Sequence, residues 1–218
     1  MKPTLIILAA ILVLATAHAE TKLTDLTPTG AEAGMVRADG DVPGKIDVGT
    51  YYDNVGSWPD WRKIVKVVPA DFKLPAGETY RTALPQAFSV GGEFIAGVGL
   101  WSKAPSAYHW LEYDIPAGAK KLTGQLFVTD DPFGYVRGYR QETNQQGLFT
   151  VLADGKEIAR ENIQRQAVGQ GSGAKVVDLN VAIPADAKKI KFRVENSGWG
   201  DGNNNTELVL RDAVFVSE

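Results

Sequence analysis

Short runs of alternating apolar and polar residues constrain this chain more than any other feature, because they follow one another from about residue 88 to the C-terminus. In the cleanest run, Ile190, Phe192 and Val194 stand between charged residues, which is typical of a half-buried β-strand. Further runs of this kind cover residues 122–129, 149–153, 177–183 and 207–216. No long segment has the helical period of about 3.6 residues. The sequence therefore predicts an all-β fold, an antiparallel β-sandwich.

A dipeptide between two strand-like runs predicts a hairpin. Asp154 and Gly155 follow the run that ends at Ala153, and a further strand-like run begins at Lys156. Asp-Gly is favoured in two-residue hairpin turns because both turn positions take a positive φ. We therefore expect the two flanking strands to pair with each other in antiparallel orientation.

The stretch from Gly91 to Asp131 combines three short predicted strands with a cluster of aromatic residues around the first turn. The cluster contains Trp101, Tyr108, His109 and Trp110. Aromatic rings grouped in a loop suit a flat, uncharged ligand such as a sugar ring. Two alternatives stay open: the tryptophans cap the end of the core, and His109, on the core side of its strand, is a buried structural residue.

The N-terminus has the pattern of a secretory signal peptide. A positive end at Met1 and Lys2 precedes an unbroken apolar run from Leu5 to Ala15, and the small-x-small pattern 17–19 indicates cleavage before Glu20. We expect residues 1–19 to be removed and the mature protein to be secreted or periplasmic, with no membrane span after cleavage. An uncleaved membrane anchor is the alternative.

The composition excludes several classes of function. Without cysteine the chain forms no disulfide, thiolate zinc site or thiol nucleophile, and a net charge of −3 without a basic cluster argues against nucleic-acid binding. After residue 19, His109 is the single histidine, too few for a histidine zinc site. Glu112 and Asp114 share a strand face, as a glycosidase pair would, but so do carboxylates of a solvated face. We expect a protein that is not an enzyme.

Several motifs resemble the NPCBM family, the "novel putative carbohydrate-binding module" domains. Gly97-Val98-Gly99-Leu100 and Asp130-Asp131 match the middle of the family pattern, and residues 22–34 are similar to its opening strand and turn. The resemblance covers about residues 23–46 and 88–217. It implies one domain over 20–218, a jelly-roll β-sandwich of the galactose-binding-like type, with an insertion at about 47–87. The insertion includes a further strand candidate at 63–68. Trp101 stands where the family usually has histidine.

The same resemblance implies a ligand-facing loop between the last two strands, at residues 198–205. Asp and Asn side chains there suit hydrogen bonds to sugar hydroxyls, and they suit calcium equally well, so a structural calcium ion stays open while no other cofactor is expected. A polar hairpin loop is the plain structural alternative. The candidate carbohydrate-binding residues are Trp101, His109, Trp199, Asp201 and Asn203.

Together these features lead to two expectations from different classes of protein. The first is a secreted bacterial, non-catalytic carbohydrate-binding module that recognises a glycan or polysaccharide through loops at one end of the sandwich. The second is an envelope structural or interaction protein that keeps the fold without sugar binding.

Overall fold

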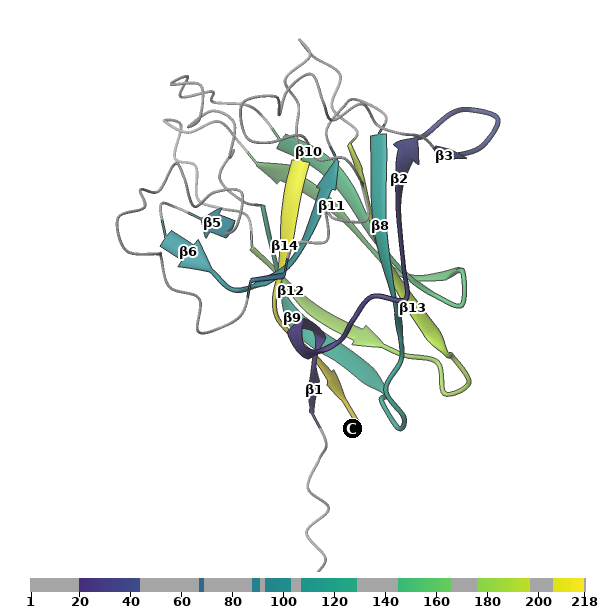
Figure 1. The fold of residues 1–218 in the computed structure, drawn as a ribbon, viewed down its shortest axis with the longest axis vertical. Helices are drawn as coiled ribbons and strands as arrows, with labels where there is room; N and C mark the ends of the chain where they lie inside the picture. The colour runs from purple at the N-terminus through teal and green to yellow at the C-terminus, as the bar shows by residue number, and fades with distance from the viewer. Residues whose placement is uncertain are drawn as a thin grey trace, which may run out of the picture.

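The computed structural model describes residues 20–43, 67–68, 88–90, 93–102, 107–128, 145–165, 176–196 and 206–217, and most of them lie in antiparallel strands (Figure 1). Sheet A has the order β12 (Val176–Ala182), β9 (Lys121–Val128), β14 (Thr206–Val216), β7 (Gly97–Ser102) and β4 (Val67–Val68), and β1 (Thr21–Lys22) also pairs with β14. Sheet B has the order β11 (Lys156–Arg165), β10 (Gln145–Ala153), β13 (Lys189–Asn196), β8 (Ala107–Asp114), β2 (Gly30–Met35) and β3 (Val42–Pro43). A separate pair is formed by β5 (Phe88–Val90) and β6 (Glu93–Ile95), and a 3-10 turn, η1 (Leu23–Asp25), follows β1.

The core lies between the two sheets. It contains Leu126 and Phe215 from sheet A and Phe149 and Phe192 from sheet B, all at most 1% exposed. The rings of Phe149 and Phe192 are parallel within 9°, with centroids 6.4 Å apart. Burying the apolar half of each alternating strand holds the layers together at roughly 25 cal/mol per Å² of apolar surface. The predicted all-β antiparallel sandwich is confirmed.

The predicted Asp-Gly hairpin is also confirmed, because residues 154 and 155 join β10 to β11. Asp154 has φ +45° and Gly155 has φ +80°, as a turn with two left-handed residues requires. The Asp154 carboxylate also accepts hydrogen bonds from the backbone N–H of Lys188 at 3.0 Å and of Lys189 at 2.9 Å. The hairpin is therefore anchored to the neighbouring turn before β13.

Two turns of similar sequence close one end of the sandwich. Residues 115–119 lead from β8 in sheet B to β9 in sheet A, and residues 183–187 lead from β12 in sheet A back to β13 in sheet B. The two turns exchange backbone hydrogen bonds, since Ile115 N–H donates to the carbonyl of Lys188 and Ile183 N–H donates to the carbonyl of Lys120, each at 2.8 Å. This reciprocal pair ties the two sheets to each other.

The strand register shows that four further connections start and end at the opposite end. Ser102, the last residue of β7, lies opposite Thr206, the first of β14, while Asn196 at the end of β13 lies opposite Gly147 near the start of β10. Residues 103–106, 129–144, 166–175 and 197–205 therefore all connect strands at this end, which we call the open end.

Two predicted segments lie largely outside the described residues. These are the signal peptide 1–19 and the insertion 47–87, of which only Val67 and Val68 are described. These two residues form β4, paired with β7, which agrees with the strand predicted at 63–68. Within the described ranges, no helix is long and apolar enough to cross a membrane.

Candidate functional site

The described residues next to the predicted binding residues lie at the open end. Trp101 is the next-to-last residue of β7 and lies opposite Glu207, and residues 197–205 are bracketed by Asn196 and Thr206 at the same end. The β7–β14 ladder therefore brings Trp101 to the end from which the stretch with Trp199, Asp201 and Asn203 departs. The side chain of Trp101 and all of those three residues lie outside the described part of the chain.

His109 lies inside the sandwich. It is 1% exposed, stands opposite Val194 of β13 and Ala33 of β2, and points to the same side of β8 as Leu111 and Tyr113. Burial lowers the pKa of His109 to about 4, so the imidazole is neutral at pH 7. The structure thus places His109 beneath the surface, on the core side that its odd-numbered neighbours predicted.

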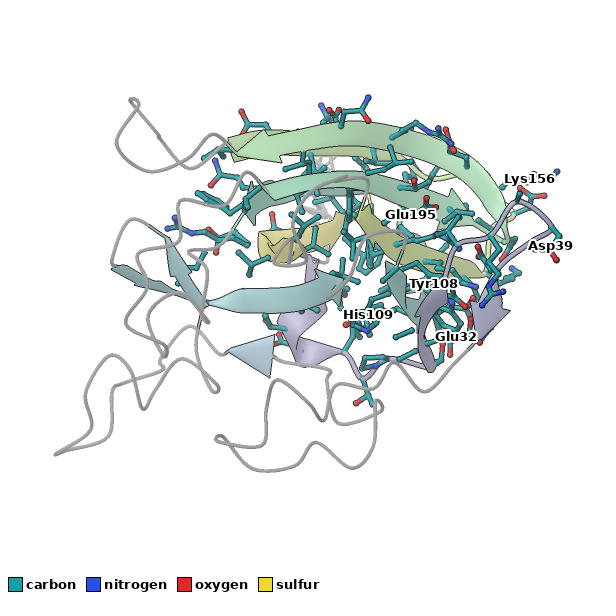
Figure 2. All side chains as sticks on the ribbon, turned by 90° about the horizontal axis from the view of Figure 1, so that it is seen from above. Glu32, Asp39, Tyr108, His109, Lys156 and Glu195 are labelled. Carbon is teal, nitrogen blue, oxygen red and sulfur yellow. The ribbon has the colours of Figure 1, made fainter. Side chains whose placement is uncertain are left out.

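Tyr108 and Trp110 point to the outer face of sheet B and share one acceptor. Tyr108 Oη donates to Glu32 Oε1 at 2.6 Å, and Trp110 Nε1 donates to the same oxygen at 3.1 Å. Figure 2 labels Tyr108 and Glu32 on the neighbouring strands β8 and β2. The Tyr108 side chain is fully buried, and burial together with this hydrogen bond raises the pKa of its hydroxyl. This Glu32–Tyr108–Trp110 network fastens β2 to β8.

Cations of β13 lie over both rings. The Arg193 guanidinium carbon is 4.5 Å from the centroid of the Tyr108 ring, and Lys191 Nζ is 3.9 Å from the centroid of the Trp110 ring. Arg193 is held by Asp41 through two hydrogen bonds and by Glu195 Oε1 at 2.8 Å. The hydrogen bond from Arg193 lowers the pKa of Asp41. Two of the four clustered aromatic residues are thus engaged by the protein itself.

Local sequence signals do not reveal this network. Glu32 is 76 residues from Tyr108 along the chain and belongs to a segment whose alternation is interrupted by glycines. One of these glycines has a packing reason: a Cβ on Gly30 would lie 3.1 Å from Cζ3 of Trp110. The Trp110 indole therefore packs over β2 at a position without a side chain. This contact depends on the pairing of β2 with β8 and cannot be predicted from either segment alone.

We expect Glu32→Ala to lower the free energy of unfolding by about 2 kcal/mol, because it leaves the Tyr108 hydroxyl and the Trp110 N–H without their acceptor. Urea denaturation followed by tryptophan fluorescence measures the loss. Tyr108→Phe supplies the control, since it should cost clearly less in the Glu32→Ala background than in the wild type. Strict additivity of the two changes would contradict the network.

Glu112 and Asp114, the carboxylates considered for glycoside hydrolysis, belong to a network of ion pairs. Glu112 Oε1 is 3.2 Å from Lys189 Nζ, Glu112 Oε2 is 3.7 Å from Lys191 Nζ, and Asp114 Oδ1 is 3.7 Å from Lys189 Nζ. This pattern is typical of a solvated sheet face. Among the described residues, no group of three or more acidic or histidine side chains could hold a metal ion.

Comparisons with known proteins give structural likeness alone. No family model and no curated protein matches the chain. It is similar to CBM51-2 and INT domains of ZmpB from Clostridium perfringens in complex with GlcNAc, with a TM-score of 0.44, 16% identity and coverage of 91% of this chain and 31% of that chain. It is also similar to the tandem CBM51 modules of a family 98 glycoside hydrolase from Streptococcus pneumoniae, with a TM-score of 0.46, 18% identity and coverage of 92% of this chain and 48% of that chain.

A third solved structure is similar over nearly its whole length. It is a CBM51 from a Clostridium perfringens glycoside hydrolase in complex with methyl-galactose, with a TM-score of 0.42, 12% identity and coverage of 90% of this chain and 99% of that chain. Likeness at this level concerns the course of the backbone and does not extend to a ligand. Membership of the NPCBM family, implied by the motifs at residues 97–100 and 130–131, therefore stays a prediction.

Proposed function

We propose that this protein is a secreted, non-catalytic carbohydrate-binding module that binds a glycan through the open end of the sandwich. The observation that supports the proposal is the β7–β14 register, in which Ser102 faces Thr206. This register brings Trp101 to the same end of the fold as Thr206, the residue that follows the stretch 198–205 in the sequence. Aromatic rings combined with amide and carboxylate groups are the usual means of binding a sugar, with the ring stacked on its C–H face and the polar groups on its hydroxyls.

Each candidate residue has a distinct part in this proposal. Trp101 and Trp199 stack on the sugar ring, while Asp201 and Asn203 accept and donate hydrogen bonds to its hydroxyls. His109 is 1% exposed, so we assign it to the support of the open end rather than to direct contact. The leader-like sequence 1–19 supports export, which the N-terminal sequence of the exported protein would test.

The test uses mature protein from residue 20 onward on a glycan array, followed by calorimetric titration with the sugars retained. GlcNAc and methyl-galactose, ligands in two of the similar structures, are the first probes. We expect Trp101→Ala and Trp199→Ala each to weaken binding by about tenfold or more. Trp110→Phe is the matched aromatic control, because its ring lies on the outer face of sheet B under Lys191, and it should bind as the wild type does.

The second candidate is an envelope structural or interaction protein that keeps the sandwich without a sugar site. It is favoured by the tryptophan at position 101, where the similar family usually has histidine. A folded protein that no glycan retains, with the two tryptophan variants indistinguishable from the wild type, would support this candidate and overturn the first.

A further inference from the structure

The two sheets differ in how their edge strands are protected. An edge strand offers unpaired backbone groups to other chains, and proteins usually block it with charges, proline, a bulge or extreme shortness. In sheet B, β3 has two residues and ends in Pro43. At the other edge, β11 pairs with β10 through a register shift and carries Glu161 opposite the inward-facing Phe149. A charge that points toward the core side of an edge strand discourages continuation of the sheet.

The edge of sheet A at β12 has fewer of these features, since its one charged residue, Asp178, lies on the exposed outer side and not on the core side. It is seven residues long, contains no lysine, arginine or proline, and pairs with β9 in a regular register without a bulge. Among the described strands, β9 is its one partner. Val176, its first residue, is 43% exposed and is the exposed large apolar side chain in the described part of the chain.

The sequence of β12, VVDLNVA, is complementary to itself about Leu179. In an antiparallel pair centred on this residue, Leu179 faces its own copy and Val177 faces Val181 on the core side. On the outer side Asp178 faces Asn180, and Val176 faces Ala182. The burial pattern agrees with this division, since Leu179 and Val181 are buried while positions 176, 178, 180 and 182 are exposed.

We propose that β12 is a dimerisation edge, which pairs in antiparallel with β12 of a second copy of this chain and continues sheet A across a two-fold axis at Leu179. A two-fold interface needs a surface complementary to itself, which the strand supplies. The Asn180 amide of one protomer donates to the partner's Asp178, whose carboxylate Gln125 Nε2 already orients at 3.0 Å on the outer face. Backbone hydrogen bonds between the two strands supply the affinity, as in other cases of strand addition.

Charge variants at Asn180 test the register, because this side chain is exposed and its replacement leaves the core intact. Asn180→Asp places like charges opposite each other twice per dimer, so dimerisation measured by sedimentation equilibrium should weaken by about tenfold. Asn180→Lys places a cation opposite the partner's Asp178, so dimerisation should become stronger by a similar factor. Wild-type protein that stays monomeric up to about 0.1 mM, or two variants that shift dimerisation in the same direction, would overturn the proposal.

Cysteine pairs give a second test, which is clean because the chain has no cysteine of its own. In the proposed register, residue 178 lies directly opposite residue 180, about 4.5 to 5.5 Å apart between Cα atoms, which a disulfide spans. A mixture of Asp178→Cys and Asn180→Cys proteins should form a linked heterodimer on mild oxidation. The exposed control Asp39→Cys, mixed with either variant, should not. If the Asn180→Cys protein alone forms more disulfide-linked homodimer than the mixture forms heterodimer, the register is different and the proposal is overturned.

Discussion

Replacing Gly97 with alanine is expected to lower the free energy of unfolding by about 3 kcal/mol or more, so that little folded protein is recovered. A Cβ at this position would lie 2.4 Å from the carbonyl oxygen of Leu210 and 2.6 Å from Cγ2 of Val209. The first of these atoms belongs to the backbone of β14, which is paired on both sides and cannot move away. Gly97 also has φ +154°, which L side chains rarely adopt.

The control for Gly97 separates the clash from the backbone strain. Gly118 also has a positive φ, +80°, but no atom lies within 4 Å of a Cβ built there. Gly118→Ala should therefore cost only the strain, about 1 kcal/mol. Urea denaturation of both variants measures the difference. Equal losses in the two proteins would show that the close approach of β7 to β14 does not determine the requirement for glycine.

Acidification from pH 6.5 to pH 4 is expected to remove about 3 kcal/mol of stability through His109 alone. Burial lowers the pKa of His109 from 6.5 to about 4, so the folded protein holds the neutral ring where the unfolded chain binds a proton. A depressed histidine pKa means that the unfolded state binds more protons in this window. Stability is therefore complete above pH 6.5 and falls as the pH approaches 4.

The measurement is the free energy of unfolding at a series of pH values for the wild type and for His109→Gln, which does not titrate. Between pH 6.5 and 4, the free energy of unfolding should change less with pH in the variant than in the wild type, whatever the variant's stability at neutral pH. The hydrogen bond from Arg193 lowers the pKa of Asp41 from 3.8, and the stability that this gives is lost only below about pH 3.8, outside the window of His109. Parallel pH profiles for the two proteins would contradict the buried, neutral histidine.

Much of the secondary structure could be predicted from the sequence, because it depends on neighbouring residues. The run around Phe192 became β13 with Ile190, Phe192 and Val194 fully buried, and the Asp154-Gly155 turn has the expected backbone angles. The core side of β8 was also predicted, since His109, Leu111 and Tyr113 are all buried. Each of these inferences uses the two-residue period of a strand or the conformational preference of a turn residue.

The candidate site was predictable only in part. The sequence singled out Trp101 and the stretch 198–205, and the β7–β14 pairing supplies the reason for treating them together. The aromatic cluster was recognised, but Tyr108 and Trp110 proved to be bound by Glu32 and covered by Arg193 and Lys191. No local pattern indicates that Glu32 would lie beside Tyr108.

The sequence by itself determined the strands with clear alternation, such as β8 and β13, and which side of them faces the core, because alternation and turn chemistry act over a few residues. Only the tertiary structure decided that β14 runs between β9 and β7, that Gly97 meets the backbone of Leu210, and that β12 stands at an edge. These relations join residues far apart in the chain. The free energy that stabilises these contacts comes from burying two surfaces against each other, and the local sequence of one surface does not indicate which distant segment it packs against.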